Sequence, residues 1–275
     1  MKRTLTRWVK QSPLEPVARW FWRRFAAPAP PELPENANET LYTFMRARLT
    51  SDSNCVDIGA SFGGYLEQML AIAPRGTHHA FEPIPQLAES LRSKFPAAKV
   101  QAVAVSDRAG HATFHYFPDV SPFSGLKRRA DVAYDERTQL IDVPTARLDN
   151  LLPEDLPIAL IKIDVEGAEL DVLRGTKKTI VTWKPALIIE HDTEPAAIYG
   201  ATPAMLHDFL NECGYAPTTA VRIRENQRAF TRDEFLETVK QGAIYNFVAL
   251  PAESLSNRVV TRVTSPSAGR PDAKI

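Results

Sequence analysis

The chain has little cysteine, no net charge and no long apolar run. Its two cysteines, Cys55 and Cys213, form neither a metal-binding spacing nor an evident disulfide framework. No stretch of about 20 apolar residues predicts a transmembrane helix, and no signal peptide is visible. The 33 basic residues balance 33 acidic ones, so no overall field attracts nucleic acid. These absences predict a cytoplasmic protein with no nucleic-acid partner.

The 275 residues are 44% hydrophobic, which is enough to bury one sizeable core. We expect a basic aromatic segment and linker over residues 1–36, a globular domain over residues 37–253, and a disordered tail over residues 254–275. Four prolines between residues 28 and 34 predict that the linker is stiff. The tail is rich in Ser, Pro, Gly and Arg, a composition typical of disorder.

Residues 1–30 differ from the rest in charge and aromatic content. Seven basic residues oppose one acid there, and three of the four tryptophans lie among them. Basic residues interleaved with Trp and Phe are typical of a helix on an anionic membrane surface, so we predict peripheral contact with the inner face of the membrane. The alternative is that these aromatic residues pack on the globular domain or on a second subunit of a homo-oligomer.

The most informative feature is a strand followed by a Gly-rich turn, at residues 54–65. An apolar strand carries an acid and then breaks at Gly59, Gly63 and Gly64, which let the backbone approach a ligand where a helix begins. A dinucleotide fingerprint requires a second glycine where this chain has Ser61, and this weakens a prediction of NAD binding. The turn therefore predicts a cradle for another cofactor.

Two further apolar strands also end in acids. Glu82 closes one of them, and Asp164 closes the other, with Glu166 two residues later. Because the carboxyl ends of parallel strands meet at one edge of a sheet, we expect these acids to converge with Asp57. An acid at the end of the second strand commonly binds the ribose hydroxyls of a nucleoside ligand, which makes Glu82 the candidate for that contact.

Alternating strand and helix patterns predict an α/β fold with a largely parallel sheet that is covered on both faces. The expected strands are 55–59, 77–82, 100–105, 159–164, 186–190, 216–221 and 245–250, and the expected helices are 65–73, 85–95, 169–176 and 203–213. A long insertion, residues 106–157, contains two alternating segments typical of a hairpin, 112–117 and 141–147. We expect it to cover the site and to set substrate selectivity, whereas a solvated surface excursion is the alternative.

Five motifs follow one another in a family-specific order. They are Val-Asp-Ile-Gly-Ala (56–60), Phe-Glu-Pro (81–83), Leu-Ile-Lys-Ile-Asp-Val-Glu-Gly-Ala-Glu (160–169), Leu-Arg-Gly (173–175) and Ile-Ile-Glu-His (188–191). From about Asn54 to Leu250 the chain resembles the FkbM family of S-adenosylmethionine-dependent methyltransferases. Ser61 departs from the family pattern, which usually has Asn there, although Ser can still donate and accept a hydrogen bond. The resemblance implies a Rossmann-like class I methyltransferase fold, with a seven-stranded sheet whose last strand is antiparallel.

The resemblance also implies S-adenosyl-L-methionine as the cofactor. The implied cofactor-binding residues are Asp57, Gly59, Ala60, Ser61, Gly63, Glu82, Pro83, Val105, Ser106 and Asp164. The turn over residues 57–63 would hold the amino acid part, Glu82 the ribose, and residues 104–106 the adenine. A purely structural role for Asp57, capping of the following turn, is the alternative.

Three residues are candidates for taking a proton from the methyl acceptor: Asp164, Glu166 and His191. A carboxylate partly stripped of water has a raised pKa and can take a hydroxyl proton, and an imidazole titrates near neutrality. The spacing of these residues in the sequence does not show which of them is the base. Lys162 precedes Asp164 by two residues and so shares its strand face, where it either steadies that acid or forms a plain structural ion pair.

These features predict an S-adenosylmethionine-dependent O-methyltransferase that acts on a hydroxyl of a glycan or small-molecule metabolite. We expect no metal, and the alternative is a divalent cation held by Asp164, Glu190 and His191. Two other functional classes stay open. A non-catalytic nucleoside-binding scaffold is disfavoured because Asp164 and Glu166 are both present. A dinucleotide-dependent oxidoreductase is disfavoured by Ser61 and by the lack of an evident set of hydride-transfer residues.

Overall fold

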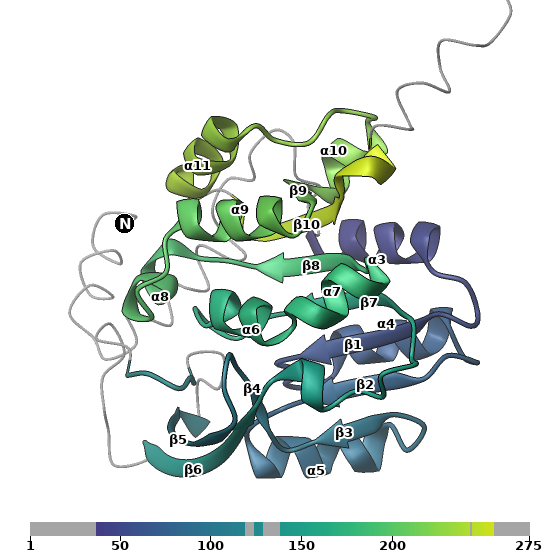
Figure 1. Cartoon of the computed structure of the whole chain (residues 1–275). Coiled ribbons are helices and arrows are strands. Elements are labelled where there is room, and N and C mark those ends of the chain that lie inside the picture. Colours follow the sequence, from purple (N-terminus) through teal and green to yellow (C-terminus); the bar gives the residue numbers. More distant parts are fainter. Residues whose placement is uncertain (1–36, 119–123, 129–137, 243, 256–275) are drawn as a thin grey trace, which may run out of the picture.

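The structure is a computed structural model that describes residues 37–118, 124–128, 138–242 and 244–255 (Figure 1). The predicted basic aromatic segment and linker, residues 1–36, lie outside the described residues. The same holds for residues 256–275 of the predicted tail. The membrane contact, the homo-oligomer and the domain boundaries therefore stay predictions.

A seven-stranded sheet forms the centre of the fold, in the order β3-β2-β1-β7-β8-β10-β9 (Figure 1). Its strands are β1 (Asn54–Ile58), β2 (His78–Phe81), β3 (Lys99–Gln101), β7 (Ile158–Ile163), β8 (Ala186–Glu190), β9 (Tyr215–Thr218) and β10 (Asn246–Pro251). β10 runs antiparallel to β8 and β9, and the other neighbouring strands are parallel. This topology confirms the Rossmann-like class I methyltransferase fold, including its antiparallel last strand.

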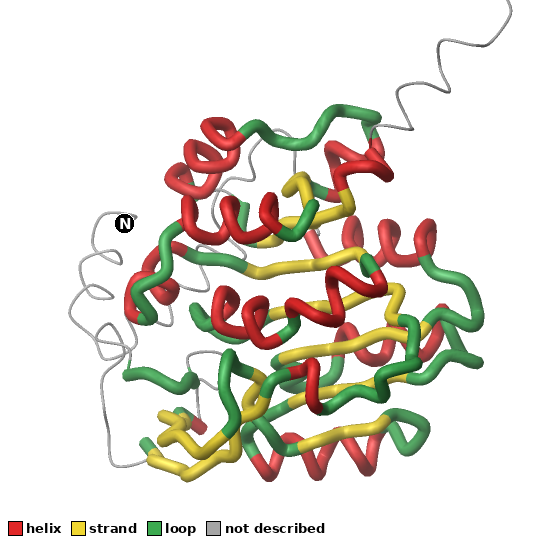
Figure 2. The backbone as a smooth tube through the Cα atoms, in the orientation of Figure 1, coloured by secondary structure: helices red, strands yellow, loops and turns green. Residues whose placement is uncertain are grey.

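Helices cover both faces of the sheet (Figure 2). They are α3 (Ala37–Arg48), α4 (Gly64–Ile72), α5 (Pro85–Lys94), α6 (Glu169–Gly175), α7 (Lys177–Trp183), α8 (Thr193–Ile198), α9 (Pro203–Glu212), α10 (Ala220–Arg224) and α11 (Arg232–Gln241). Apolar residues of α6, α7, α9 and α11 cluster with Ile161 and Ile163 on one face, and those of α3, α4 and α10 cluster with Leu160 on the other. Because both faces are covered, the strands are apolar on both. No helix among these described residues is long and apolar enough to span a membrane.

The four predicted helices are confirmed to within one residue at each end, as α4, α5, α6 and α9. The sequence patterns did not predict α3, α7, α8, α10 or α11. One of these carries a start signal that is visible in the sequence. At α11, the Thr231 hydroxyl accepts from Glu234 N at 3.3 Å, and the Glu234 carboxylate accepts from Thr231 N at 2.9 Å. This reciprocal pair is a capping box.

Two predicted strands are wrong in extent. The predicted strand 100–105 is split into β3 and β4 (Ala104–Val105), which belong to different sheets. The predicted strand 216–221 ends at Thr218, because the Thr219 hydroxyl accepts from Arg222 N at 3.1 Å and so caps the start of α10. In both places the apolar residues form a run long enough for one strand, but the chain turns within that run and the strand ends there.

The hairpin predicted in the insertion is confirmed by β5 (Gly110–Tyr116) and β6 (Gln139–Ala146), which pair antiparallel. With β4 they form a three-stranded sheet in the order β4-β6-β5. The chain then returns to β7 through a short 3-10 helix, η3 (Leu148–Asn150). A Cβ on Gly175 would lie 2.0 Å from the carbonyl oxygen of Ser106, so this glycine lets the start of the insertion lie directly against α6.

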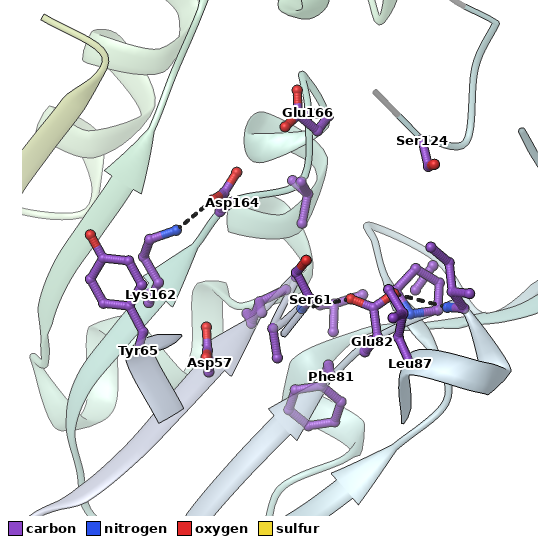
Figure 3. A pocket seen from close by; sticks show the side chains of 18 of the residues that line it. Asp57, Ser61, Tyr65, Phe81, Glu82, Leu87, Ser124, Lys162, Asp164 and Glu166 are labelled. Atoms are coloured by element: carbon purple, nitrogen blue, oxygen red, sulfur yellow. Dashed lines mark hydrogen bonds and ion pairs between the residues drawn. The ribbon is translucent and has the colours of Figure 1, made fainter. Parts of the chain in front are cut away.

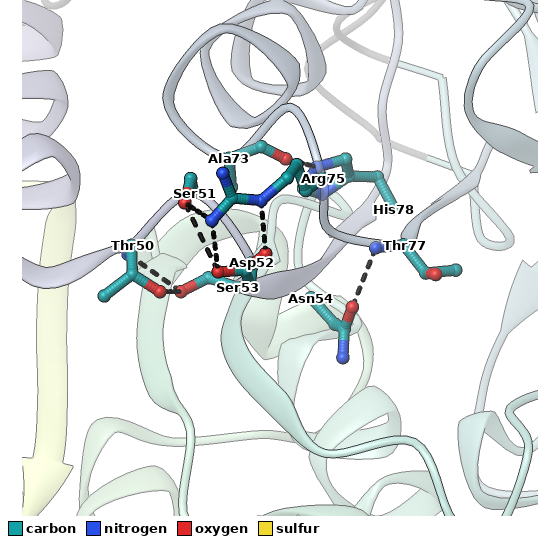
Figure 4. A network of polar contacts seen from close by, with 9 residues as sticks. All are labelled: Thr50, Ser51, Asp52, Ser53, Asn54, Ala73, Arg75, Thr77 and His78. Atoms are coloured by element: carbon teal, nitrogen blue, oxygen red, sulfur yellow. Dashed lines mark hydrogen bonds and ion pairs between the residues drawn. The ribbon is translucent and has the colours of Figure 1, made fainter.

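Polar contacts join the loops at the amino ends of the strands (Figure 4). Asn54, at the start of β1, donates to the carbonyl of Pro157 at 2.9 Å and accepts from Thr77 N at 2.7 Å. Arg75 donates to Asp52 through Nε at 2.6 Å and through Nη2 at 2.7 Å. These contacts tie together the ends of the strands that lie away from the three acids.

Candidate active site

A cavity of about 380 Å³ opens at the carboxyl ends of β1, β2 and β7 (Figure 3). Its lining includes the turn after β1, Glu82 at the end of β2, and Asp164 and Glu166 after β7. The predicted convergence of Asp57, Glu82 and Asp164 on one edge of the sheet is therefore confirmed. This edge is where open α/β sheets bind their ligands.

The Gly-rich turn passes very close to the chain that follows β7. Gly59 has a φ of 75°, and a Cβ at this residue would lie 1.8 Å from the carbonyl oxygen of Asp164. Gly63 has a φ of 80°, and a Cβ there would lie 2.4 Å from the ring of Phe95, which directly follows α5. Both positions therefore require glycine for its small size as well as for its left-handed backbone.

We expect Gly59→Ala to lower the melting temperature strongly. Overpacking costs about 1–3 kcal/mol, and the left-handed backbone adds roughly 1–2 kcal/mol for any residue with a Cβ. Gly200→Ala is the matched control, because Gly200 has a φ of 74° and its Cβ would meet nothing within 4 Å. Thermal unfolding followed by circular dichroism compares the variants. Equal melting temperatures would show that the overlap with Asp164 is relieved at no cost.

Asp57 is buried at the cavity and leaves one acceptor open. It is 2% exposed and accepts a hydrogen bond from the backbone N–H of Leu66, whereas its Oδ2 has no hydrogen-bond partner among the described residues. Burial raises the pKa of Asp57 to about 6; Lys162 opposes this shift and Asp164 adds to it. The bond from Leu66 matches the capping role. The open oxygen suits a ligand that brings a donor or a positive charge.

Glu82 is held by two backbone amides. Its Oε2 accepts from Ser61 N at 2.8 Å and its Oε1 accepts from Ile84 N at 3.0 Å. Glu82 is 4% exposed, and burial raises its pKa to about 7 although both hydrogen bonds oppose the shift. Each carboxylate oxygen keeps a second lone pair, so Glu82 can also accept from ligand hydroxyls. Ser61 thus acts through its backbone N–H, which orients Glu82.

Lys162 brings one positive charge to the acids. It lies beside Asp57 in the register of β1 and β7, and its Nζ lies 3.0 Å from Asp164 Oδ2. The same Nζ lies 4.7 Å from the centre of the Tyr65 ring, and Lys162 is 1% exposed. The predicted contact between Lys162 and Asp164 is therefore present. With four carboxylates, those of Asp57, Glu82, Asp164 and Glu166, and one ammonium group among the described lining residues, the cavity favours a ligand that carries positive charge.

Glu166 reaches the cavity from a strained turn. Its φ is 54° and that of Gly167 is 107°. The N–H of Gly167 donates to Glu169 Oε1 at 2.8 Å, and a Cβ on Gly167 would lie 2.5 Å from the carbonyl group of Pro195 in α8. Glu169 and α8 thus hold the turn on the side of Gly167. A left-handed residue other than glycine costs roughly 1–3 kcal/mol, and such strain clusters at functional sites.

His191 is not among the residues that line the cavity. It is 2% exposed, its Nδ1 lies 3.4 Å from Glu169 Oε2, and its backbone N–H donates to the carbonyl of Tyr245 at 2.7 Å. The imidazole is therefore packed behind the turn that carries Glu166. Of the three candidate bases, the structure brings Asp164 and Glu166 to the cavity and leaves His191 outside its lining.

Two of the ten implied cofactor-binding residues also lie outside the lining. Gly63 faces α5, as described above, and Ser106 turns toward the insertion, where its N–H donates to the carbonyl of Ala146 at 2.9 Å. The eight that line the cavity are Asp57, Gly59, Ala60, Ser61, Glu82, Pro83, Val105 and Asp164. The sequence motifs thus located the cavity correctly. Gly63 and Ser106 do not line it and lie in the backbone next to it.

The three residues considered for a divalent cation do not meet at the cavity. Asp164 lines it, whereas Glu190 and His191 do not. Within the described ranges, no group of three or more His, Cys, Asp or Glu residues is arranged to hold a metal ion. The structure therefore offers no support for a cation held by these three side chains.

Several cavity residues gave no signal in the sequence. Asn38 and Tyr42 come from α3, which precedes every family motif, and Phe114 and Leu126 come from the insertion. Ser124, also from the insertion, lines the cavity and accepts from Phe117 N at 3.0 Å through its hydroxyl. The prediction that the insertion covers the site is confirmed, although periodicity alone could not say which of its residues do so.

The chain shares part of its sequence with several known proteins. The chain is 33% identical to 2-O-methyltransferase NoeI of Sinorhizobium fredii, over 47% of this chain and 59% of NoeI. It is 30% identical to 31-O-demethyl-FK506 methyltransferase FkbM of Streptomyces tacrolimicus, over 44% of this chain and 58% of that protein. It is also 27% identical to AMB antimetabolite synthetase AmbE of Pseudomonas aeruginosa, over 84% of this chain and 13% of the synthetase. Each match spans less than two thirds of the relative.

A solved structure of methyltransferase FkbM from Methylobacillus flagellatus KT aligns with 74% of this chain and 44% of its own, with a TM-score of 0.46 and 15% identity. At the level of sequence, the methyltransferase FkbM domain matches residues 57–217, which is more than half of the chain. That segment carries the Gly-rich turn and all three converging acids. The chain belongs to the FkbM methyltransferase family.

Proposed function

We propose that the protein is an S-adenosylmethionine-dependent O-methyltransferase that acts on a hydroxyl of a glycan or small-molecule metabolite. The observation that carries the proposal is the charge of the cavity: its described lining holds four carboxylates, those of Asp57, Glu82, Asp164 and Glu166, and one ammonium group, that of Lys162. S-adenosylmethionine carries a sulfonium and an ammonium group, so it supplies the positive charge that this cavity favours.

The residues present fit this cofactor. The open Oδ2 of Asp57 suits an ammonium donor, and Glu82 can accept from two ribose hydroxyls. Phe81, Val103 and Val105 provide an apolar wall for an aromatic base. When bound, the cofactor supplies a methyl group that its sulfonium has already activated. The protein has to align the acceptor, exclude water and take the acceptor's proton.

Asp164 and Glu166 are the residues that we assign to the acceptor's proton. Both line the cavity, and each is held in place: Asp164 by Lys162 at 3.0 Å, and the Glu166 turn by Glu169. A fixed carboxylate within reach of the acceptor can take the hydroxyl proton as the methyl is transferred. Phe114 and Leu126 lie in the same cavity and give the acceptor an apolar surface.

Support for a hydroxyl acceptor comes from the relatives. NoeI is named a 2-O-methyltransferase, and the Streptomyces protein is named a 31-O-demethyl-FK506 methyltransferase. The test is transfer of a labelled methyl group from S-adenosylmethionine to a panel of hydroxylated glycans and metabolites, with a heat-inactivated sample as control. Label in a base-stable ether product supports the proposal. Full cofactor binding with no transfer to any hydroxyl would favour the non-catalytic scaffold instead.

Cofactor binding is expected to release protons near pH 6.5. Burial raises the pKa of Asp57 to about 6 and that of Glu82 to about 7, so the folded protein holds these protons more tightly than the unfolded chain does. The stability that they contribute is full below the unfolded pKa of about 4 and is lost as the pH rises through about 6 to 7. A cationic cofactor favours the ionised acids, so its affinity should rise with pH over this window.

Calorimetry in buffers of different ionisation enthalpy measures the proton release directly. We expect release at about pH 6.5 and little release at about pH 8.5, where both acids are already ionised. Glu82→Gln, which cannot ionise, should release fewer protons than the wild type. A binding heat at pH 6.5 that does not depend on the buffer would contradict this linkage.

A further inference from the structure

Helix α3 lines part of the cavity, although it precedes the segment 57–217 that matches the family. Its apolar side, with Leu41 and Met45, is buried in the cluster that covers the sheet. Asn38 and Tyr42 lie four residues apart, so they project from the same side of the helix, and both line the cavity. The helix therefore presents two polar side chains to the ligand from a firmly packed element.

The Tyr42 hydroxyl lies over the start of α4. A Cβ on Gly64 would lie 3.7 Å from this hydroxyl, and the Tyr42 ring packs edge-on against Tyr65 with the ring centres 5.4 Å apart. Burial and the nearby charges of Asp57, Glu39 and Glu67 raise the pKa of Tyr42, which keeps its hydroxyl protonated. No hydrogen bond to this hydroxyl occurs in the part of the chain that the structure describes. Among the described residues it is therefore a donor without an acceptor.

Asn38 adds a second donor beside it. Its Oδ1 accepts from the Tyr65 hydroxyl at 3.3 Å, which directs the other end of the amide, the NH₂ group, away from Tyr65. Helix α4 begins in the same region, and its N-cap, Gly63, makes no side-chain cap. The start of a helix carries partial positive charge from its unpaired N–H groups. These donors line the same cavity as the open Oδ2 of Asp57.

We propose that Asn38 and Tyr42 bind the α-carboxylate of S-adenosylmethionine at the start of α4, while Asp57 receives its α-ammonium. This inference rests on the proposed function and deepens it, because it assigns the amino acid end of the cofactor to residues outside the family match. An α-amino acid group offers one acceptor and one donor on adjacent atoms. The cavity offers the complementary pair, with donors from α3 and an unpaired carboxylate oxygen from β1.

Two substitutions in the full-length chain test the assignment. Tyr42→Phe removes only the hydroxyl and keeps the packing on Tyr65. Asn38→Asp keeps an acceptor for Tyr65 but replaces the amide donor with a negative charge. Thr43→Ala is the control, because Thr43 lies exposed on the same helix and does not line the cavity. Calorimetry compares S-adenosylmethionine with decarboxylated S-adenosylmethionine, which keeps the ammonium and sulfonium and lacks only the carboxylate.

Each substitution should weaken S-adenosylmethionine binding about ten-fold or more, as expected for loss of a hydrogen bond to a charged group. Binding of the decarboxylated ligand should change less than about two-fold with Tyr42→Phe and should not weaken with Asn38→Asp. Unchanged affinity for S-adenosylmethionine in both variants overturns the inference. Equal weakening for both ligands also overturns it, since it would show a role in cavity shape. If the wild type binds neither ligand, the proposed function itself fails and this inference falls with it.

Discussion

Asp164→Asn is expected to lower the rate of methyl transfer by about 10²- to 10⁴-fold, which is the usual effect of losing a general base. The substitution keeps the size and shape of the side chain, but an amide cannot take the acceptor's proton. Affinity for S-adenosylmethionine should fall much less than the rate does. Single-turnover transfer of a labelled methyl group measures the rate, and calorimetry measures the affinity.

Two further variants make this result interpretable. Asp155→Asn is the control, because Asp155 is exposed and does not line the cavity. Glu166→Gln is compared in parallel, since Glu166 shares the cavity with Asp164. The variant with the larger loss of rate identifies the base. If Asp164→Asn and Glu166→Gln both turn over at the wild-type rate, neither carboxylate takes the proton.

Glu82→Ala is expected to weaken S-adenosylmethionine binding by roughly ten- to a hundred-fold, from the loss of about 1.5–3 kcal/mol of hydrogen bonding. The carboxylate is positioned for this contact by the backbone amides of Ser61 and Ile84. Its removal therefore takes away the proposed ribose acceptor and also the hydrogen bond that the Ser61 N–H donates. Calorimetric titration of the folded variant measures the loss.

Glu89→Ala is the matched control for this titration. Glu89 lies on α5, is exposed, and contacts Arg92 at 3.0 Å, so its loss should leave cofactor affinity unchanged. A folded Glu82→Ala protein that binds S-adenosylmethionine as tightly as the wild type would remove Glu82 from the binding site.

The parts of the site that lie on strand ends could be predicted from the sequence. Asp57 lies near the carboxyl end of its strand, and Glu82 and Asp164 directly follow theirs, so parallel topology alone brings them to one edge. The pairing of Lys162 with Asp164 followed from their spacing of two residues on one strand. These contacts are local, or they follow from the order of strands in the sheet.

The parts that depend on tertiary packing could not be predicted. The imidazole of His191 follows a strand end as the acids do, but it turns inward to the buried carboxylate of Glu169. Nothing in the local sequence pattern shows whether a side chain at a strand end points into the cavity or into the protein interior. Tyr42 reaches the cavity because α3 packs over β1, the next element along the chain, and over β7, which lies far from it in the sequence. Such contacts become visible only once the helices are placed on the sheet.

The central claim is that the cavity binds S-adenosylmethionine, and calorimetric titration of the wild-type chain tests it most directly. The protein is titrated separately with S-adenosylmethionine and with NAD⁺ at about pH 8, where both buried acids are ionised. We predict saturable binding of one S-adenosylmethionine per chain and no binding of NAD⁺, because the cavity favours positive charge and Ser61 replaces the second glycine of a dinucleotide fingerprint. Binding of NAD⁺ without binding of S-adenosylmethionine would contradict the claim.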